Sequence, residues 1–196
     1  MNIANIITIV RLLFTPFIIW LILSGYYKAS FIFFILSGLS DAIDGFIAKK
    51  FNQITVLGSY LDPLADKILI VSSILVLGFI GIIPSWLLIL IVSRDLAILG
   101  AVIISWLMES DLKIEPIFSS KINTFLQILY ICLILLNLSN FINLNTLGSF
   151  IIPYLSYIIG FFTSLSWGIY LVLWLKNIGI ISTSENHEKL KMITHN

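Results

Sequence analysis

Four aspartates lie between residues 41 and 66 of a chain that is 59% hydrophobic: Asp41, Asp44, Asp62 and Asp66. A charge near the centre of a bilayer costs roughly 2.5 to 3.5 kcal/mol on insertion scales. Carboxylates in such apolar segments therefore need a bound cation or an aqueous cavity. On helices, the first two are spaced i,i+3 and the last two i,i+4, so each pair projects from one face. Two such faces brought together would form a divalent-cation site.

The ligand chemistry of this acidic cluster favours a hard cation. Carboxylate oxygens suit Mg²⁺, Mn²⁺ or Ca²⁺, and the absence of Cys or His near the cluster argues against zinc or copper. A bound Mg²⁺ normally completes its shell with water and phosphate oxygens, and it can stabilise a departing phosphate. Gly45, Ala48 and Gly58 lie beside the carboxylates, where small side chains allow a ligand or another helix to approach closely. We therefore expect phosphate chemistry that depends on Mg²⁺ or Mn²⁺.

The elements that must position these residues are membrane helices. Charged residues are 11% of the chain, and the mean hydropathy is +1.08. Apolar windows of about 20 residues, the length that crosses a bilayer, occur near 6–24, 29–50, 57–81, 84–108, 120–142 and 150–175. The sequence predicts an all-α, polytopic integral membrane protein with six transmembrane helices, comprising a membrane domain over 1–181 and a polar cytoplasmic tail over 182–196.

The lysines predict the orientation in the membrane. They lie between the second and third windows, between the fourth and fifth, and after the sixth, whereas the alternate connections carry only Lys28. By the positive-inside rule, both termini and the acidic cluster are then cytoplasmic.

The first window has no basic region before it and contains Arg11, so we expect a retained helix rather than a cleaved signal. A net charge of +1 predicts no nucleic-acid partner.

Polar residues on the first window form a stripe. Asn5, Thr8 and Arg11 are spaced i,i+3,i+6, so they share one helix face. This stripe either faces a ligand or lets Arg11 extend to the membrane interface.

The acidic segment closely resembles the signature of the CDP-alcohol phosphatidyltransferases. That signature is Asp-x2-Asp-Gly-x2-Ala-Arg-x8-Gly-x3-Asp-x3-Asp, and this chain reads Asp41-x2-Asp44-Gly45-x2-Ala48-Lys49-x8-Gly58-x3-Asp62-x3-Asp66. It departs from the pattern only at Lys49. Lysine keeps the positive charge but lacks the planar, two-pronged guanidinium, so a phosphate contact there would be weaker or shared with Lys50.

The resemblance implies a six-helix membrane fold, usually dimeric, that uses divalent metal ions to transfer the phosphatidyl group of CDP-diacylglycerol to an alcohol, releasing CMP. Carried onto this chain, it implies that Asp66 is the catalytic base and that the metal ligands are Asp41, Asp44, Asp62 and Asp66. We assign binding of the CDP-lipid to Asn5, Thr8, Gly45, Ala48, Lys49 and Gly58. The expected location is a bacterial inner membrane, with the active site facing the cytoplasm.

Further resemblance concerns the acceptor alcohol. The segment 2–11 looks like the opening of the phosphatidylglycerophosphate synthase and CMP-forming cardiolipin synthase branch, and Ser93-Arg94-Asp95 and 118–124 look more like the cardiolipin synthases. An acceptor with a phosphate monoester should require more fixed positive charge than this chain offers. We therefore expect phosphatidylglycerol as acceptor, bound by Arg94 and Lys121, with glycerol 3-phosphate as the alternative.

Two other classes of protein remain possible on the residues alone. Intramembrane carboxylates also mark cation or proton-coupled transporters, although these charges cluster in one half of the bilayer and no inverted repeat is evident. An inactive, metal-dependent structural protein is the other alternative.

The remaining charged residues have structural explanations as well. Arg94 and Asp95 point about 100° apart on a helix and need not pair with each other. Lys67 is either a structural counter-ion or a substrate ligand.

Overall fold

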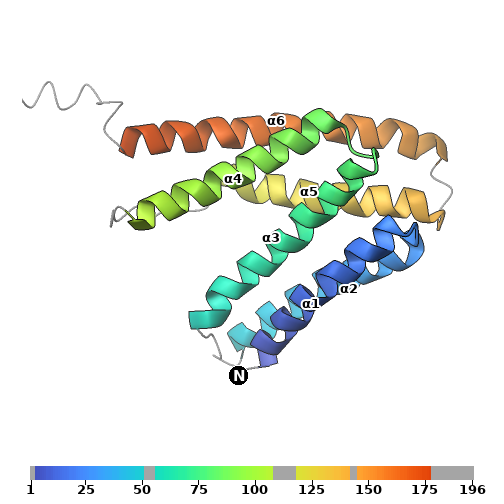
Figure 1. Ribbon diagram of the computed structural model, residues 1–196, viewed down its shortest axis with the longest axis horizontal. Coiled ribbons are helices and arrows are strands. Elements are labelled where there is room, and N and C mark those ends of the chain that lie inside the picture. The colour runs from blue at the N-terminus through green and yellow to red at the C-terminus, as the bar shows by residue number, and fades with distance from the viewer. Residues whose placement is uncertain (1–2, 51–55, 108–117, 142–144, 178–196) are drawn as a thin grey trace, which may run out of the picture.

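The computed structural model describes residues 3–50, 56–107, 118–141 and 145–177, and within them the side chains of residues 8–40, 65–98, 120–141 and 150–172. Throughout this part of the chain the regular elements are α-helices (Figure 1): α1 (Ile3–Leu23), α2 (Tyr27–Lys50), α3 (Val56–Phe79), α4 (Ser85–Leu107), α5 (Phe118–Ser139) and α6 (Asn145–Asn177). Each coincides with one predicted window. The all-α prediction is confirmed.

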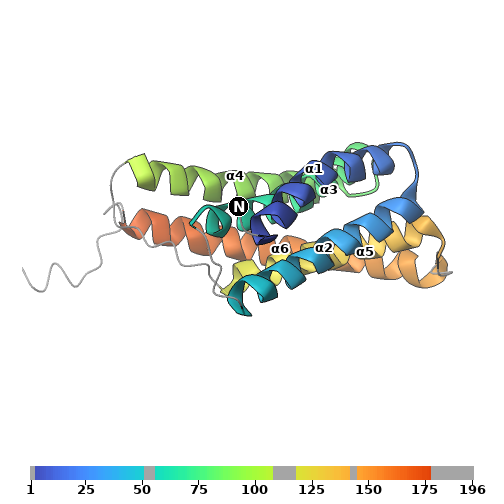
Figure 2. The ribbon, with the colours of Figure 1, turned by 90° about the horizontal axis from the view of Figure 1, so that it is seen from below.

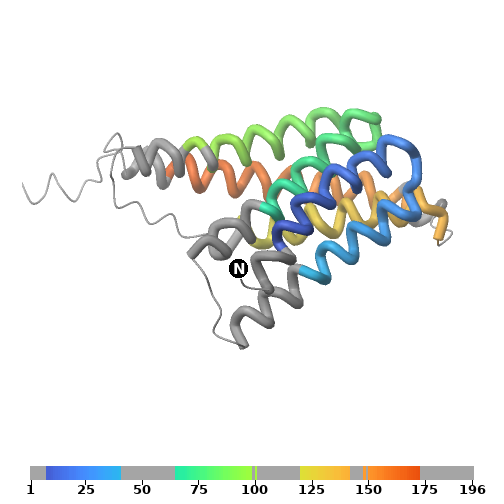
Figure 3. Tube along the Cα trace, turned by 60° about the horizontal axis from the view of Figure 1, so that its bottom comes forward, coloured from blue at the N-terminus to red at the C-terminus, as the bar shows by residue number. Residues whose placement is uncertain are grey.

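The helices form two layers of three (Figure 2). One layer contains α4, α3 and α1, and the other contains α6, α5 and α2. Within the layers α3 packs against both α1 and α4, and α5 packs against both α2 and α6. Across the layers α1 contacts α2, α3 contacts α5, and α4 contacts α6. The two middle helices, α3 and α5, therefore touch neighbours in both layers, and α1 lies alongside both α2 and α3 (Figure 3).

The tight connections at one end of the bundle depend on residues with positive φ. Gly25 (φ 77°) ends α1 and Gly81 (φ 78°) ends α3, a backbone conformation that glycine adopts without steric cost. After α1, the N–H of Tyr26 donates to the carbonyl of Leu21 at 2.9 Å, as in a Schellman cap. Asn140 (φ 51°) follows α5 in the same way. These caps let each following helix reverse direction and pack against the bundle.

Buried charged side chains and the apolar core lie at different distances from the turns. The half nearest these turns is filled by buried apolar residues from all six helices, including Ile22, Phe34, Ile74, Leu87, Leu135 and Ile159. The buried charged side chains Arg11, Arg94 and Asp95 lie further from the turns, whereas buried hydroxyl residues such as Ser30 and Ser139 also occur beside the turns. The interior thus has an apolar half near the turns, and the buried charges Arg11, Arg94 and Asp95 lie in the other half. Among the predicted site residues with described side chains, Thr8, Asp66 and Arg94 lie in the half that holds the buried charges.

Two stretches of the described chain are long and apolar enough to cross a membrane, Ser120–Ser139 in α5 and Phe150–Val172 in α6. The described parts of α1 and α2 contribute shorter apolar stretches, Thr8–Leu23 and Tyr27–Ser40. Large hydrophobic side chains are exposed on many faces, among them Leu13, Phe79 and Phe161. Exposed apolar area of this extent is typical of a surface that contacts another apolar phase.

Candidate functional site

A partly buried ion pair joins Asp66 on α3 to Arg11 on α1. The Nη1 of Arg11 donates to the Oδ1 of Asp66, and the side chain of Arg11 is 1% exposed whereas that of Asp66 is 37% exposed. Of the two roles left open for Arg11, the structure does not support extension to the interface, since the guanidinium lies inside the bundle. Thr8, one turn earlier on α1, is also buried. The ion pair holds Asp66 in place while one side of its carboxylate stays accessible.

The accessible side of Asp66 faces a cavity of about 330 Å³ between α2, α3 and α5. Its walls are mainly apolar, lined by Phe34, Ile35, Leu39, Leu69, Ile70, Ile128 and Cys132. Gly38 and Leu39 on α2 are exposed, so the cavity reaches the surface of the molecule. Its polar groups include Asp66, Thr124 and Ser37, and the Oγ of Ser37 is buried without a hydrogen-bond partner among the described residues. A cavity of this kind suits an apolar chain whose polar end lies near Asp66.

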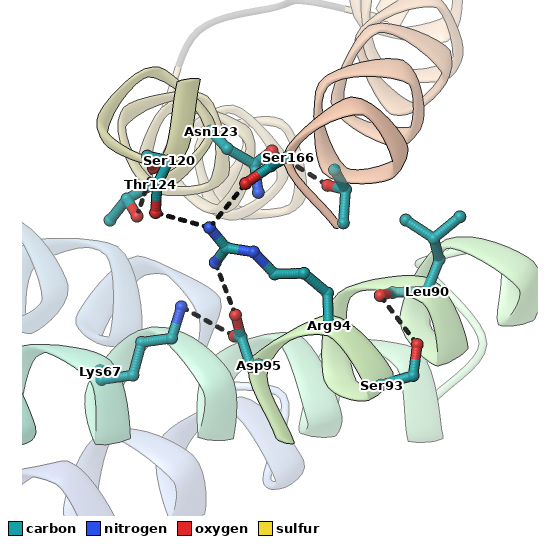
Figure 4. A network of polar contacts seen from close by, with 10 residues as sticks. Lys67, Leu90, Ser93, Arg94, Asp95, Ser120, Asn123, Thr124 and Ser166 are labelled. Carbon is teal, nitrogen blue, oxygen red and sulfur yellow. Dashed lines mark hydrogen bonds and ion pairs between the residues drawn. The ribbon is translucent and has the colours of Figure 1, made fainter. Parts of the chain in front are cut away.

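A second polar cluster lies between α3, α4, α5 and α6 (Figure 4). The Nζ of Lys67 lies 2.8 Å from Oδ2 of Asp95 on α4, and Oδ1 of the same carboxylate accepts a hydrogen bond from Nη1 of Arg94 at 2.8 Å. The Nη2 of Arg94 then donates to the hydroxyls of Ser120 on α5, at 2.6 Å, and Ser166 on α6, at 3.1 Å. Four helices are therefore connected through Asp95 and Arg94.

A further hydrogen bond continues this polar cluster between α5 and α6. The hydroxyl of Thr163 donates to Oδ1 of Asn123 at 2.9 Å, and both side chains are fully buried. Buried polar groups are expensive unless they are paired, so these contacts specify how α4, α5 and α6 pack. Ser120 lies in the segment 118–124 that resembles the cardiolipin synthases, but its contact with Arg94 was not predicted. Thr163 and Ser166 were not singled out from the sequence, because hydroxyl residues are common in apolar helices and few of them meet a charge.

The structure separates the two predicted acceptor ligands. Arg94 is 2% exposed and has partners on three helices, whereas Lys121 is exposed in the first turn of α5. Arg94 and Asp95 do pair with each other, and Lys67 is the counter-ion of Asp95. A role of Arg94 or Lys121 in acceptor binding stays a prediction.

Most of the predicted metal and CDP-lipid ligands have side chains outside the described residues. Their backbones lie on α1, α2 and α3: Asn5, Asp41, Asp44, Gly45, Ala48, Lys49, Gly58 and Asp62. Among the side chains that the structure does describe, no group of three or more His, Cys, Asp or Glu could hold a metal. The helical backbone preserves the predicted i,i+3 and i,i+4 spacings of the aspartates, and an all-carboxylate donor set fits a hard divalent cation. The metal site stays a prediction.

These features define an all-helical protein that carries a carboxylate beside an apolar cavity, with apolar helices suited to a membrane. Comparison with known families narrows the class further. The family model of the CDP-alcohol phosphatidyltransferases matches residues 1–165, and the chain belongs to this family. The resemblance seen in the acidic signature is confirmed.

The relatives of this chain include proteins named as glycerol-3-phosphate phosphatidyltransferases and proteins named as cardiolipin synthases. The chain is 35% identical over 153 residues to the chloroplastic CDP-diacylglycerol–glycerol-3-phosphate 3-phosphatidyltransferase 1 of Oryza sativa subsp. japonica, covering 69% of this chain and 46% of the relative. It is 33% identical over 144 residues to a probable CMP-forming cardiolipin synthase of Drosophila melanogaster, covering 65% and 45%. A CDP-diacylglycerol–glycerol-3-phosphate 3-phosphatidyltransferase of Bacillus subtilis is 29% identical over 151 residues, covering 69% and 77%. The chain thus spans about half the length of the first two relatives.

Proposed function

We propose that this protein transfers the phosphatidyl group of CDP-diacylglycerol to the hydroxyl of an alcohol and releases CMP. In this reaction the acceptor oxygen forms a bond to the phosphatidyl phosphorus, the bond from that phosphorus to the bridging pyrophosphate oxygen breaks, and that oxygen leaves with CMP. The observation that carries the proposal is the position of Asp66. The last carboxylate of the family signature is held by Arg11 at the wall of an apolar cavity that reaches the molecular surface.

We assign to Asp66 the role of taking the proton of the acceptor hydroxyl. A general base must lie within hydrogen-bonding reach of that proton, and the accessible side of Asp66 meets the cavity where a lipid headgroup would arrive. Arg11 fixes the orientation of the carboxylate. Mg²⁺ or Mn²⁺, held by Asp41, Asp44, Asp62 and Asp66, would polarise the phosphorus and neutralise charge on the departing CMP. The hydroxyl of Ser37 is available to an ester carbonyl of the lipid.

We infer that phosphatidylglycerol is the acceptor, so that the product is cardiolipin. The support is the likeness of Ser93-Arg94-Asp95 and of 118–124 to the cardiolipin synthases, together with the neutral Asn123 in that segment, where a further positive charge would favour a phosphate monoester. Glycerol 3-phosphate is the alternative, because relatives with that acceptor in their names match this chain about as well as those named cardiolipin synthases. Only the acceptor distinguishes these two reactions, and the catalytic carboxylates are the same.

The proposed setting is a bacterial inner membrane. In this arrangement all six helices cross the bilayer, both termini and the acidic cluster face the cytoplasm, and the protein forms a homodimer. The support is the agreement of the six helices with six apolar windows, together with the lysine distribution. Acyl chains can then remain in the bilayer while the cytidine diphosphate group reaches the aspartates from the cytoplasm.

The direct test supplies purified protein in proteoliposomes with CDP-diacylglycerol, Mg²⁺ and one acceptor at a time. Phosphatidylglycerol, glycerol 3-phosphate, inositol phosphate and serine are compared, with CMP release and product mass as readouts. We expect CMP release with phosphatidylglycerol and a product of the mass of cardiolipin. Preference for glycerol 3-phosphate would replace the acceptor assignment, and absence of CMP release with all four would contradict the transferase proposal.

Filling the cavity should weaken use of the CDP-lipid. Gly38 lines the cavity, and a Cβ added there meets nothing within 4 Å, so the backbone can accept a larger side chain such as that of Gly38→Leu beside the cavity. The change also removes a glycine from a helix. We expect the KM for CDP-diacylglycerol to rise roughly tenfold with little change in kcat, because the variant loses lipid binding equally in the ground state and the transition state. Thermal stability should not fall. The matched control is Gly168→Leu on α6, where a Cβ also meets nothing within 4 Å and which does not line the cavity. Equal KM values in the two variants would show that the cavity does not bind this lipid.

A further inference from the structure

Two consecutive residues of α3 form ion pairs with two different helices. Asp66 pairs with Arg11 on α1, and Lys67 pairs with Asp95 on α4, with 2.8 Å between Nζ and Oδ2. Successive residues of a helix project about 100° apart, so one helix turn presents its two charges to two different neighbours. In the layer that contains α4, α3 and α1, the middle helix is thus held from both sides (Figure 2).

The ion pair between Lys67 and Asp95 connects α3 and α4, two helices that diverge. α3 and α4 meet at the connection that follows Phe79, and they separate toward their other ends (Figure 1). Lys67 lies along this separating stretch, and its long side chain reaches Asp95 (Figure 4). The contact therefore fixes α3 at a level where apolar packing against α4 decreases.

Asp95 is itself rigidly held. Its side chain is 5% exposed, and its other oxygen accepts a hydrogen bond from Arg94, which in turn donates to Ser120 and Ser166. Charged side chains in such surroundings are costly to leave without a partner. The α3 helix is consequently connected through Lys67 and Asp95 to α4, α5 and α6 together.

From this arrangement we propose that Asp95 is a positioning residue for catalysis: by holding Lys67, it sets the rotation of α3 about its axis so that Asp66 faces the cavity. A rotation of α3 by one residue would break the Arg11 pair and the Asp95 pair together. Lys67 then acts through α3 and does not bind substrate phosphate. This inference rests on the proposed transferase function, because it assigns Asp66 its catalytic orientation.

The test is a double-mutant cycle of Lys67→Met, Asp95→Asn and the double variant, with kcat and both KM values measured in proteoliposomes. In the wild-type background Lys67→Met should lower kcat roughly 10- to 100-fold, the effect of a small displacement of a catalytic group, while the KM values change by less than about twofold. In the Asp95→Asn background the same change should cost little, because the pair is already broken. Lys67→Arg should retain most of the activity.

Two further measurements make the outcomes distinguishable. Lys28→Met is the matched control, since Lys28 is exposed beside Phe141 at the other end of the bundle and should leave kcat unchanged. The thermal midpoints of the same four proteins report the pair without any turnover, and they should also be non-additive. A rise in KM with unchanged kcat for Lys67→Met, or additive losses in both kcat and thermal midpoint, would overturn the positioning role. Failure of the transferase proposal would appear instead as a wild type without CMP release but with non-additive thermal midpoints.

Discussion

Asp66→Asn is expected to abolish turnover, with CMP release falling by roughly 10³-fold, the size of effect that loss of a general base produces. The amide keeps the shape of the side chain, so it can still lie beside Arg11 at the cavity wall. It cannot accept a proton from the acceptor hydroxyl. Binding of CDP-diacylglycerol at saturating Mg²⁺ should remain measurable, because the cavity is unchanged. Single-turnover CMP release and equilibrium lipid binding on the same preparation provide the measurement.

Asp62→Asn is the matched control for this variant. It removes the same charge one helical turn earlier on α3, so it should raise the Mg²⁺ concentration needed for half-maximal activity rather than abolish turnover at saturating metal. A thermal melt of both variants separates loss of folding from loss of chemistry, since Arg11 is buried beside Asp66. Near-normal turnover of Asp66→Asn would exclude its role as the base.

The helices could be predicted from the sequence because each apolar window is about 20 residues long, even where a few charged residues lie within it. The boundaries differ in ways that have local causes. The window 120–142 overruns α5, which ends at Ser139 because Asn140 adopts a left-handed conformation. The window 150–175 starts late, because α6 begins with the polar residues that follow position 144, which hydropathy does not detect.

The sequence also predicted which charged residues belong to the candidate site, but it did not predict which of them form ion pairs. Arg11 and Asp66 are separated by 55 positions, and only the packing of α1 on α3 brings them together. For Arg94 and Asp95, the 100° between neighbouring Cα–Cβ directions gave no reason to expect a contact. The long arginine side chain reaches back to its neighbour and still extends to α5 and α6. Such contacts depend on side-chain length and on partners 26 and 72 positions away, neither of which a sequence pattern encodes.

The same network gives Arg94 and Lys121 different expected roles, although the sequence assigns both to the acceptor. Arg94 is buried and connects α4, α5 and α6 through Asp95, Ser120 and Ser166. A glutamine at this position is neutral and too short to reach all three partners, and it leaves the carboxylate of Asp95 with Lys67 alone. Breaking a buried pair in this way typically costs about 3 to 5 kcal/mol. We therefore expect Arg94→Gln to lower the free energy of unfolding by about that amount.

Lys121→Gln supplies the comparison within the same segment. Lys121 is exposed, and removing an exposed charge usually changes stability by no more than about 0.5 kcal/mol. If it contacts the phosphodiester of phosphatidylglycerol, its loss should raise the acceptor KM several-fold and leave the KM for CDP-diacylglycerol within about twofold. Thermal unfolding in detergent and substrate titrations of both variants decide between these roles. An unchanged melting temperature for Arg94→Gln together with a higher acceptor KM would contradict the structural role of Arg94 and support its role as an acceptor ligand.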